Sequence, residues 1–149
     1  MEVGPRDGLQ IERSVFSTDQ KVDLIERLLA AGLRQIEVGS FVNPKAVPQM
    51  ADSGEVFQRL PDRLDVEYHG LWLNAKGLQR AVECGKVKVT GKLIITATDT
   101  FSRKNTNKSI AETLEDIPNW IAHYRGAGIE TDDVHIPAAF GCNFEGPVP

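Results

Sequence analysis

The sequence predicts an α/β fold, namely a partial (β/α)8 TIM barrel that contains about the first five β/α units. Stretches typical of strands alternate along the chain with stretches typical of helices, and this alternation indicates βαβ units around a parallel sheet. A complete barrel needs roughly 250 residues, whereas this chain has 149. Residues 1–149 are therefore predicted to be a single barrel domain that lacks the C-terminal strands.

An open, doubly wound parallel sheet is the competing architecture, because it has the same alternation of strands and helices. Many such sheets bind dinucleotides through a GxGxxG turn directly after the first strand. No such turn follows residues 2–5, the first predicted strand. This absence weakens the prediction of a dinucleotide-binding domain and favours the barrel.

The strands are predicted where short apolar runs are bounded by turn residues, at residues 2–5, 34–41, 63–73, 92–98 and 134–138. The helices are predicted between them, at residues 17–32, 53–59, 75–84 and 109–125. Between the second strand and the next helix lies a loop that contains Pro44 and Pro48. No repeat and no low-complexity linker interrupts this order.

Local capping signals set the ends of several predicted helices. Gln20 lies three residues after Ser17, and Glu112 lies three residues after Ser109. This is the spacing of a capping box at a helix start. Glycine follows the last apolar residue of the first predicted helix, where Gly32 is expected to be the C-cap. Pro118 lies inside the last predicted helix and is expected to kink it.

Composition and charge exclude several classes of protein. The chain is 41% hydrophobic and 26% charged, with a net charge of -4, which is typical of a soluble globular protein and gives no basic cluster for nucleic acid. No apolar run approaches the roughly 18 residues that cross a bilayer, and the first residues lack the features of a signal peptide. Cys84 and Cys142 form no CxxC motif. We therefore expect a cytoplasmic protein without nucleic-acid or membrane partners.

Side chains alternate between the two faces of a strand, and this places charges on the inner face of the predicted barrel. Ile36 and Val38 share the face that meets the helices, so Glu37 points into the barrel. The same alternation turns Glu2 and Arg6 inward from the first strand. A buried carboxylate is costly unless it is paired, so we predict an Arg6–Glu37 ion pair, with Glu2 as a further candidate partner.

Such a pair has two interpretations: a structural salt bridge that fills the barrel, or part of an active site. Arg6 and Asp7 end the first predicted strand, and catalytic residues of TIM barrels gather at the C-terminal ends of the strands. The carboxylate of Asp7 is the kind of ligand that Mg²⁺ or Mn²⁺ prefers. An Asp after a strand is also a frequent turn or cap residue.

Five segments carry a resemblance to a known family. They are EVGPRDGLQ at residues 2–10, SFVNPKAVPQMAD at 40–52, NAKG at 74–77, FSRKN at 101–105 and FGCNFEG at 140–146. In this order they resemble hydroxymethylglutaryl-CoA lyases, which belong to the metal-dependent TIM-barrel superfamily that also contains isopropylmalate and homocitrate synthases. The resemblance runs over nearly the whole chain and matches an N-terminal fragment of such an enzyme.

The resemblance implies a retro-Claisen cleavage of 3-hydroxy-3-methylglutaryl-CoA, or of a close relative, to acetyl-CoA and acetoacetate, a reaction associated with leucine degradation. Asp7 would ligate the divalent metal, Mg²⁺ or Mn²⁺, and Arg6 would stabilise the enolate. Glu37 would orient Arg6. Gln10 and Ser40 would place the acyl-CoA substrate. The complete enzyme is expected to be a homo-oligomer.

The family takes further metal ligands from a His-x-His pair and a later Asn, and a catalytic Cys from a glycine-rich loop. This chain has none of them, and its histidines, His69, His123 and His135, are interpreted as structural or exposed. Cys142 matches a different family cysteine. The isolated chain is therefore expected to bind metal poorly and to be inactive.

Two other functions remain open: a condensing acyltransferase of the isopropylmalate or homocitrate synthase type, and a non-catalytic truncated product. The segment 40–52 favours the lyase over the condensing enzyme. Basic residues in loops are candidates for contact with the phosphates of coenzyme A: Lys45, Arg103, Lys104 and Lys108. Residues 68–74 depart from the commonest family pattern, so the acyl group of the substrate is less defined than the reaction.

Overall fold

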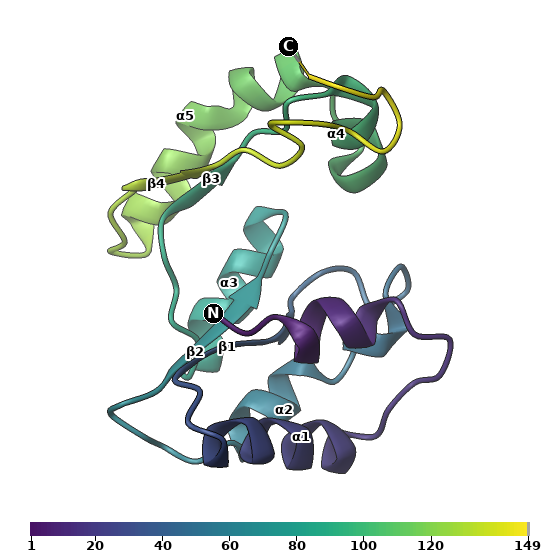
Figure 1. Cartoon of the computed structure of the whole chain (residues 1–149). Helices are drawn as coiled ribbons and strands as arrows, with labels where there is room; N and C mark the ends of the chain where they lie inside the picture. The colour runs from purple at the N-terminus through teal and green to yellow at the C-terminus, as the bar shows by residue number, and fades with distance from the viewer. Residues whose placement is uncertain (149) are drawn as a thin grey trace. The chain divides into compact units, whose positions relative to one another are not determined.

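The structure is a computed structural model that describes residues 1–148 (Figure 1). The chain divides into two compact units, Met1–Val89 and Thr90–Pro149, and each unit contains a two-stranded parallel sheet. The described residues thus form four strands, together with an isolated β-bridge at Glu2. The predicted alternation of strands and helices is confirmed, while the count of five β/α units and the single domain stay predictions.

The first unit is built on strands β1 (Gln35–Ser40) and β2 (Glu67–Leu71), which pair in parallel and are drawn side by side in Figure 1. Helices α1 (Thr18–Ala30), α2 (Ser53–Arg59) and α3 (Ala75–Cys84) surround this sheet, and a short 3-10 turn, Pro48–Met50, precedes α2. The best buried side chains of its core are Ile25, Ile36, Val56, Phe57 and Leu60. The two helices predicted at residues 53–59 and 75–84 are confirmed with the same bounds.

The two predicted capping boxes are confirmed, one in each unit, whereas the C-cap of α1 is Ala31 rather than Gly32. The Ser17 side chain accepts a hydrogen bond from the Gln20 N–H, while the Gln20 side chain accepts one from the Ser17 N–H. Ser109 and Glu112 make the same reciprocal contacts at the start of α5 (Ile110–Gly126). These contacts are local in sequence, and so they form wherever the helix forms.

The predicted first strand, residues 2–5, is wrong beyond Glu2. Glu2 pairs with β1 through two backbone hydrogen bonds, but the chain then turns into a five-residue π-helical turn, η1 (Gly4–Gly8). The N–H groups of Arg6 and Asp7 both bond to the Val3 carbonyl, at 3.1 and 2.7 Å. Pro5, the second residue of this turn, has no N–H to give to a sheet, and a helical turn tolerates proline near its start. Arg6 and Asp7 consequently lie on a tight turn rather than on an extended strand.

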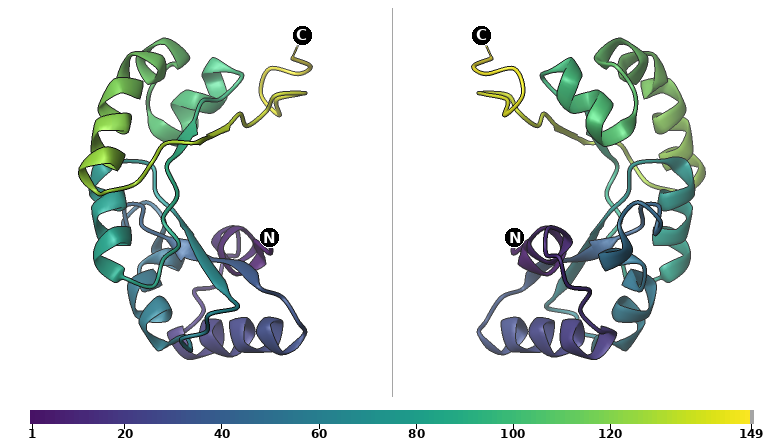
Figure 2. Two further views of the ribbon diagram at one scale, coloured as in Figure 1. Left: turned by 90° about the vertical axis from the view of Figure 1, so that its left-hand side faces the viewer. Right: turned by 90° about the vertical axis from the view of Figure 1, so that its right-hand side faces the viewer.

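The second unit contains β3 (Lys92–Ile94), β4 (Asp133–His135), α4 (Asp99–Thr106) and α5 (Ile110–Gly126). Figure 2 shows α5 running alongside the two strands of this unit, to which it is tied by the Tyr124 hydroxyl, a donor to the Lys92 carbonyl at 2.8 Å. Helix α4 was not predicted, and the predicted strand 92–98 is shorter by four residues. No helix within residues 1–148 is long and apolar enough to cross a membrane.

Candidate active site

The centre of the candidate site is the side chain of Arg6, which is held between two carboxylates. Its Nε and Nη2 lie 2.7 and 2.6 Å from Glu37 Oε2, and its Nη1 lies 3.0 Å from Asp7 Oδ1. The predicted Arg6–Glu37 ion pair is therefore confirmed. Glu2 is not a partner, because its Oε1 accepts the Gly4 N–H at 2.6 Å instead.

Burial makes the Arg6–Glu37 pair a strong local constraint. The side chains of Arg6 and Glu37 are only 17% and 10% exposed. Removing one member of a buried pair leaves an uncompensated charge, which typically costs about 3–5 kcal/mol. Glu37 comes from β1 and Arg6 from the turn η1, and the Glu2 bridge to β1 lies directly beneath that turn. The fold of this unit thus sets the orientation of the guanidinium.

Asp7 differs from Glu37 because its side chain is 62% exposed. One of its oxygens contacts Arg6, and the exposure leaves the carboxylate accessible to a divalent cation. Within residues 1–148, however, no group of three His, Cys, Asp or Glu side chains lies close enough together to hold a metal ion. Asp7 therefore fits the role of one metal ligand, and the described residues do not supply a coordination set around it.

The two predicted substrate-placing residues lie apart from this cluster. Gln10 is half-buried just after η1, and Ser40 ends β1. Neither makes a hydrogen bond or ion pair with Arg6, Asp7 or Glu37 among the described residues. The Ser40 hydroxyl is buried and finds no hydrogen-bond partner in residues 1–148. A buried hydroxyl without a partner is uncommon, and a ligand group could satisfy it.

His69 is a residue of this region that the sequence analysis set aside. It lies opposite Glu37 in the β1–β2 register, and its Nε2 is buried at 3.4 Å from Glu67 Oε2. Partial desolvation raises the pKa of the Glu67 carboxyl. The positive charge of Lys88 and the hydrogen bonds from Lys88, His69 and Gln35 outweigh this effect and bring the pKa below its ordinary value. The same alternation that singled out Glu37 would have identified His69, which is two residues from Glu67 on the same face.

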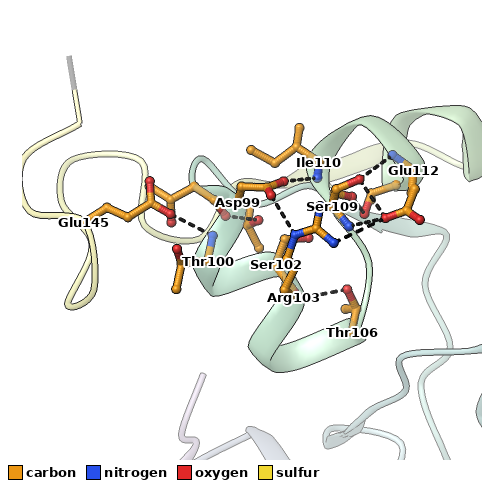
Figure 3. A network of polar contacts seen from close by, with 12 residues as sticks. Asp99, Thr100, Ser102, Arg103, Thr106, Ser109, Ile110, Glu112 and Glu145 are labelled. Carbon is orange, nitrogen blue, oxygen red and sulfur yellow. Dashed lines mark hydrogen bonds and ion pairs between the residues drawn. The ribbon is translucent and has the colours of Figure 1, made fainter.

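Three of the four basic residues proposed for coenzyme A phosphates are engaged locally in the second unit. Arg103 Nε lies 2.8 Å from Asp99 Oδ2, as Figure 3 shows. Lys108 Nζ lies 2.6 Å from Asp116 Oδ2. Lys104 Nζ stands 4.8 Å from the centre of the Phe144 ring. Only Lys45, which is exposed in the loop after β1, has no such side-chain partner among the described residues. The predicted contacts with coenzyme A phosphates stay predictions.

The motifs at residues 101–105 and 140–146 contact each other in the second unit. The Glu145 carboxylate accepts the Thr100 N–H at 2.7 Å (Figure 3), and Phe101 and Phe144 lie with ring centres 6.2 Å apart. The Thr98 hydroxyl donates to Cys142 Sγ at 3.0 Å, and this hydrogen bond lowers the pKa of the buried Cys142 thiol. Through these contacts the segment after β4 packs against α4.

The chain was compared with protein families, curated proteins and solved structures. The family described as HMGL-like matches residues 1–148. The chain is 41% identical over 148 residues to the 3-hydroxy-3-isohexenylglutaryl-CoA/hydroxy-methylglutaryl-CoA lyase of Pseudomonas aeruginosa, covering 99% of this chain and 48% of that protein. It is 40% identical over 148 residues to the mitochondrial hydroxymethylglutaryl-CoA lyase of Bos taurus, covering 99% and 45%.

Solved structures give the same result. The hydroxymethylglutaryl-CoA lyase of Pseudomonas aeruginosa superposes with a TM-score of 0.85 at 41% identity, covering 100% of this chain and 49% of that one. An HMG-CoA lyase from Acinetobacter baumannii, solved in complex with coenzyme A and 3-methylmalate, gives a TM-score of 0.83 at 37% identity, covering 99% and 47%. The chain spans about half the length of the curated relatives it matches.

Proposed function

The chain belongs to the HMGL-like family, and from this premise we propose that it forms part of a divalent-metal-dependent lyase. The proposed reaction is a retro-Claisen cleavage of 3-hydroxy-3-methylglutaryl-CoA, or of a close branched relative, to acetoacetate and acetyl-CoA. The similar proteins are hydroxymethylglutaryl-CoA lyases, and the similar structures are TIM-barrel lyases, which supports both the lyase class and the barrel. One relative whose name includes a longer acyl group keeps the exact substrate open.

The observation that carries this proposal is the Arg6 guanidinium fixed between Glu37 and Asp7. Arginine has five N–H donors. In Arg6, Nε and Nη2 each direct one N–H to Glu37, and Nη1 directs one to Asp7. Two N–H donors therefore remain for a substrate oxygen. A cation that is already oriented stabilises charge as it develops, without reorganisation during the reaction.

The proposed chemistry needs such a cation. The bond between C2 and C3 of the glutaryl group breaks, and its electron pair passes into the thioester to give the enolate of acetyl-CoA. The C3 hydroxyl loses its proton and becomes the ketone of acetoacetate, while the enolate takes up a proton. Arg6 would stabilise the enolate oxygen, and Glu37 would hold Arg6 in orientation.

Asp7 would be one ligand of the divalent metal, Mg²⁺ or Mn²⁺, because it is an exposed carboxylate beside Arg6. When bound, the metal would polarise the substrate's hydroxyl and carbonyl oxygens as a Lewis acid. Gln10 and Ser40 would place the substrate, and the unpartnered Ser40 hydroxyl is the stronger of these two candidates. Homo-oligomeric assembly and a cytoplasmic location remain predictions.

Release of acetyl-CoA from hydroxymethylglutaryl-CoA, measured with added Mg²⁺ or Mn²⁺, tests the proposal on the protein that contains this chain. Consumption of acetyl-CoA together with a keto acid, without release, would instead identify a condensing acyltransferase. A titration of the 149-residue chain with Mn²⁺ addresses the non-catalytic alternative. Tight stoichiometric binding to this chain would contradict our view that Asp7 is one ligand of an incomplete set.

A further inference from the structure

A second ion pair, whose cation is buried and whose carboxylate is 25% exposed, lies outside the proposed catalytic cluster in the same unit. Lys21 is on α1 and is only 3% exposed, an unusual position for a lysine. Its Nζ lies 2.5 Å from Asp52 Oδ1 and 2.6 Å from the carbonyl oxygen of Gln49. Both partners belong to the loop that leads from β1 to α2. The pair therefore joins an outer helix to the loop that follows the end of β1.

Asp52 uses both of its carboxylate oxygens for this connection. Oδ1 contacts Lys21, and Oδ2 accepts the Thr18 hydroxyl at 2.8 Å. Asp52 also occupies the N-cap position of α2, where an Asp normally accepts an N–H of the first turn. Its side chain makes no cap hydrogen bond. The carboxylate thus faces α1 at the expense of its usual capping contact, which typically stabilises a helix by about 1 kcal/mol.

The connection continues from Asp52 to the end of β1. Its neighbour Ser53 is 4% exposed, accepts the Ser40 N–H at 3.1 Å and donates to the Met50 carbonyl at 2.8 Å. A Cβ added to Gly39 would lie 2.5 Å from Ser53 Oγ, so β1 and Ser53 approach closely only because residue 39 is glycine. An uninterrupted series of contacts consequently links Lys21 to the backbone of Ser40.

The loop is tied at the other side to the segment that carries Arg6 and Asp7. Gln49 Nε2 donates to the Glu12 carbonyl at 2.9 Å. Glu12 follows η1, and its N–H bonds to the Leu9 carbonyl. The loop 41–52 is therefore connected, through Gln49, to a residue that follows the segment 2–10.

We propose that the Lys21–Asp52 ion pair positions the loop 41–52 and, through Ser53, the end of β1 at Ser40. Lys21 is thus a positioning residue that reaches no reacting atom itself. Its relevance to catalysis rests on the proposed function, whereas the positioning itself is a property of this chain. A buried pair of this kind suits the task because its geometry is set by several contacts, and a loop held only by exposed residues would open readily.

Hydrogen exchange of backbone amides in the 149-residue chain tests this inference without any substrate. The amides of Ala46, Val47, Met50 and Ala51 bond within the loop, and the amide of Ser40 bonds to Ser53. In Lys21→Met these amides are expected to exchange about tenfold faster. The Glu67 amide, which bonds to the Arg34 carbonyl at 2.7 Å, is the internal reference and is expected to keep its rate.

Two further variants separate positioning from a general loss of stability. Lys21→Arg keeps the charge and the donors, and it is expected to restore most of the protection. Arg59→Met is the matched control, because the Arg59–Asp19 pair also joins α2 to α1. Unlike Lys21, these side chains are exposed, Arg59 by 42% and Asp19 by 79%. The control is expected to leave loop exchange unchanged, since exposed pairs contribute little.

Unchanged loop exchange in Lys21→Met, or equal acceleration of the loop and of Glu67, would overturn the inference. Should Lys21→Met not fold, Thr18→Val decides, because it removes only the hydroxyl that contacts Asp52 and keeps the side-chain shape. That variant is expected to speed loop exchange about threefold, and an unaltered rate would refute the positioning role. Neither result depends on lyase activity, so the inference and the proposed function can fail separately.

Discussion

The two units use charged residues in different ways. In the first unit, Arg6–Glu37 and Lys21–Asp52 are largely buried pairs that join residues 31 positions apart in sequence. In the second unit, the pairs around α4 and α5 are mostly exposed and local, such as Arg103 with Asp99 four residues away. The charged pairs of the first unit thus hold distant segments together, whereas those of the second unit mainly stabilise helix ends.

The largest expected effect is on catalysis, and it comes from the first unit. We expect Arg6→Gln to lower kcat of the lyase about a thousandfold, because a neutral amide replaces the cation proposed to face the enolate. Acetyl-CoA release measures the rate, and circular dichroism checks the fold. Arg125→Gln, which changes an exposed basic residue of the second unit, is the control and is expected to keep near-normal kcat. A near-normal kcat in Arg6→Gln would remove the basis of the proposed mechanism.

The next effect concerns stability. Glu37→Gln leaves the guanidinium of Arg6 buried without its carboxylate and is expected to destabilise the chain by about 3 kcal/mol. Arg103→Gln breaks an exposed pair and is expected to cost less than about 1 kcal/mol. Urea unfolding of the two variants measures both values. Equal losses would show that the units do not differ in the way we describe.

Metal binding is expected to change by a smaller factor. Asp7→Ala removes an exposed oxygen ligand and is expected to weaken Mn²⁺ binding to the lyase about tenfold or more. Asp116→Ala, in the second unit, removes a carboxylate that contacts Lys108 and serves as the control. Isothermal titration with Mn²⁺ distinguishes the two. An unaltered affinity in Asp7→Ala would exclude this residue as a ligand.

The smallest expected effect is a pH dependence in the second unit. Asp99 accepts the Ile110 N–H at 2.8 Å, and this bond, followed by the one from Arg103, lowers the pKa of the Asp99 carboxyl. A carboxyl with a lower pKa in the folded state contributes stability above its ordinary pKa, which is lost as the pH falls through the folded value. NMR titration of the Asp99 carboxyl is expected to give a midpoint below the usual Asp range. A midpoint within that range would mean that the contact is absent in solution.

Local chemistry made part of the fold predictable. The helices beginning after Ser17, Asn74 and Ser109 start where a side chain caps the first turn, and α3 ends at Gly85, whose φ of 72° suits glycine. Alternation along β1 likewise placed Glu37 opposite to Ile36 and Val38, from which the pair with Arg6 was predicted. These signals act over a few residues and need no knowledge of distant partners.

Other features were missed because competing local signals are similar in strength. Residues 2–5 resemble a strand, but only Glu2 reaches β1, and the N–H groups of Arg6 and Asp7 bond back to Val3. Helix α4 contains Thr, Ser and Asn, which are indifferent helix formers, and the Glu145 carboxylate accepts an N–H of its first turn. This contact depends on a group 45 residues away in the sequence.

The sequence by itself determined the order of elements, their caps and the presence of a cation and carboxylates near the start of the chain. The Arg6–Glu37 pair was predictable, but the other partners of the charged groups follow from the tertiary structure. Glu2, the second candidate for Arg6, accepts the Gly4 N–H instead, and Asp52 contacts Lys21 rather than capping its helix. The physical reason is that several partners are available to each charged group, and burial against the sheet and α1 selects among them.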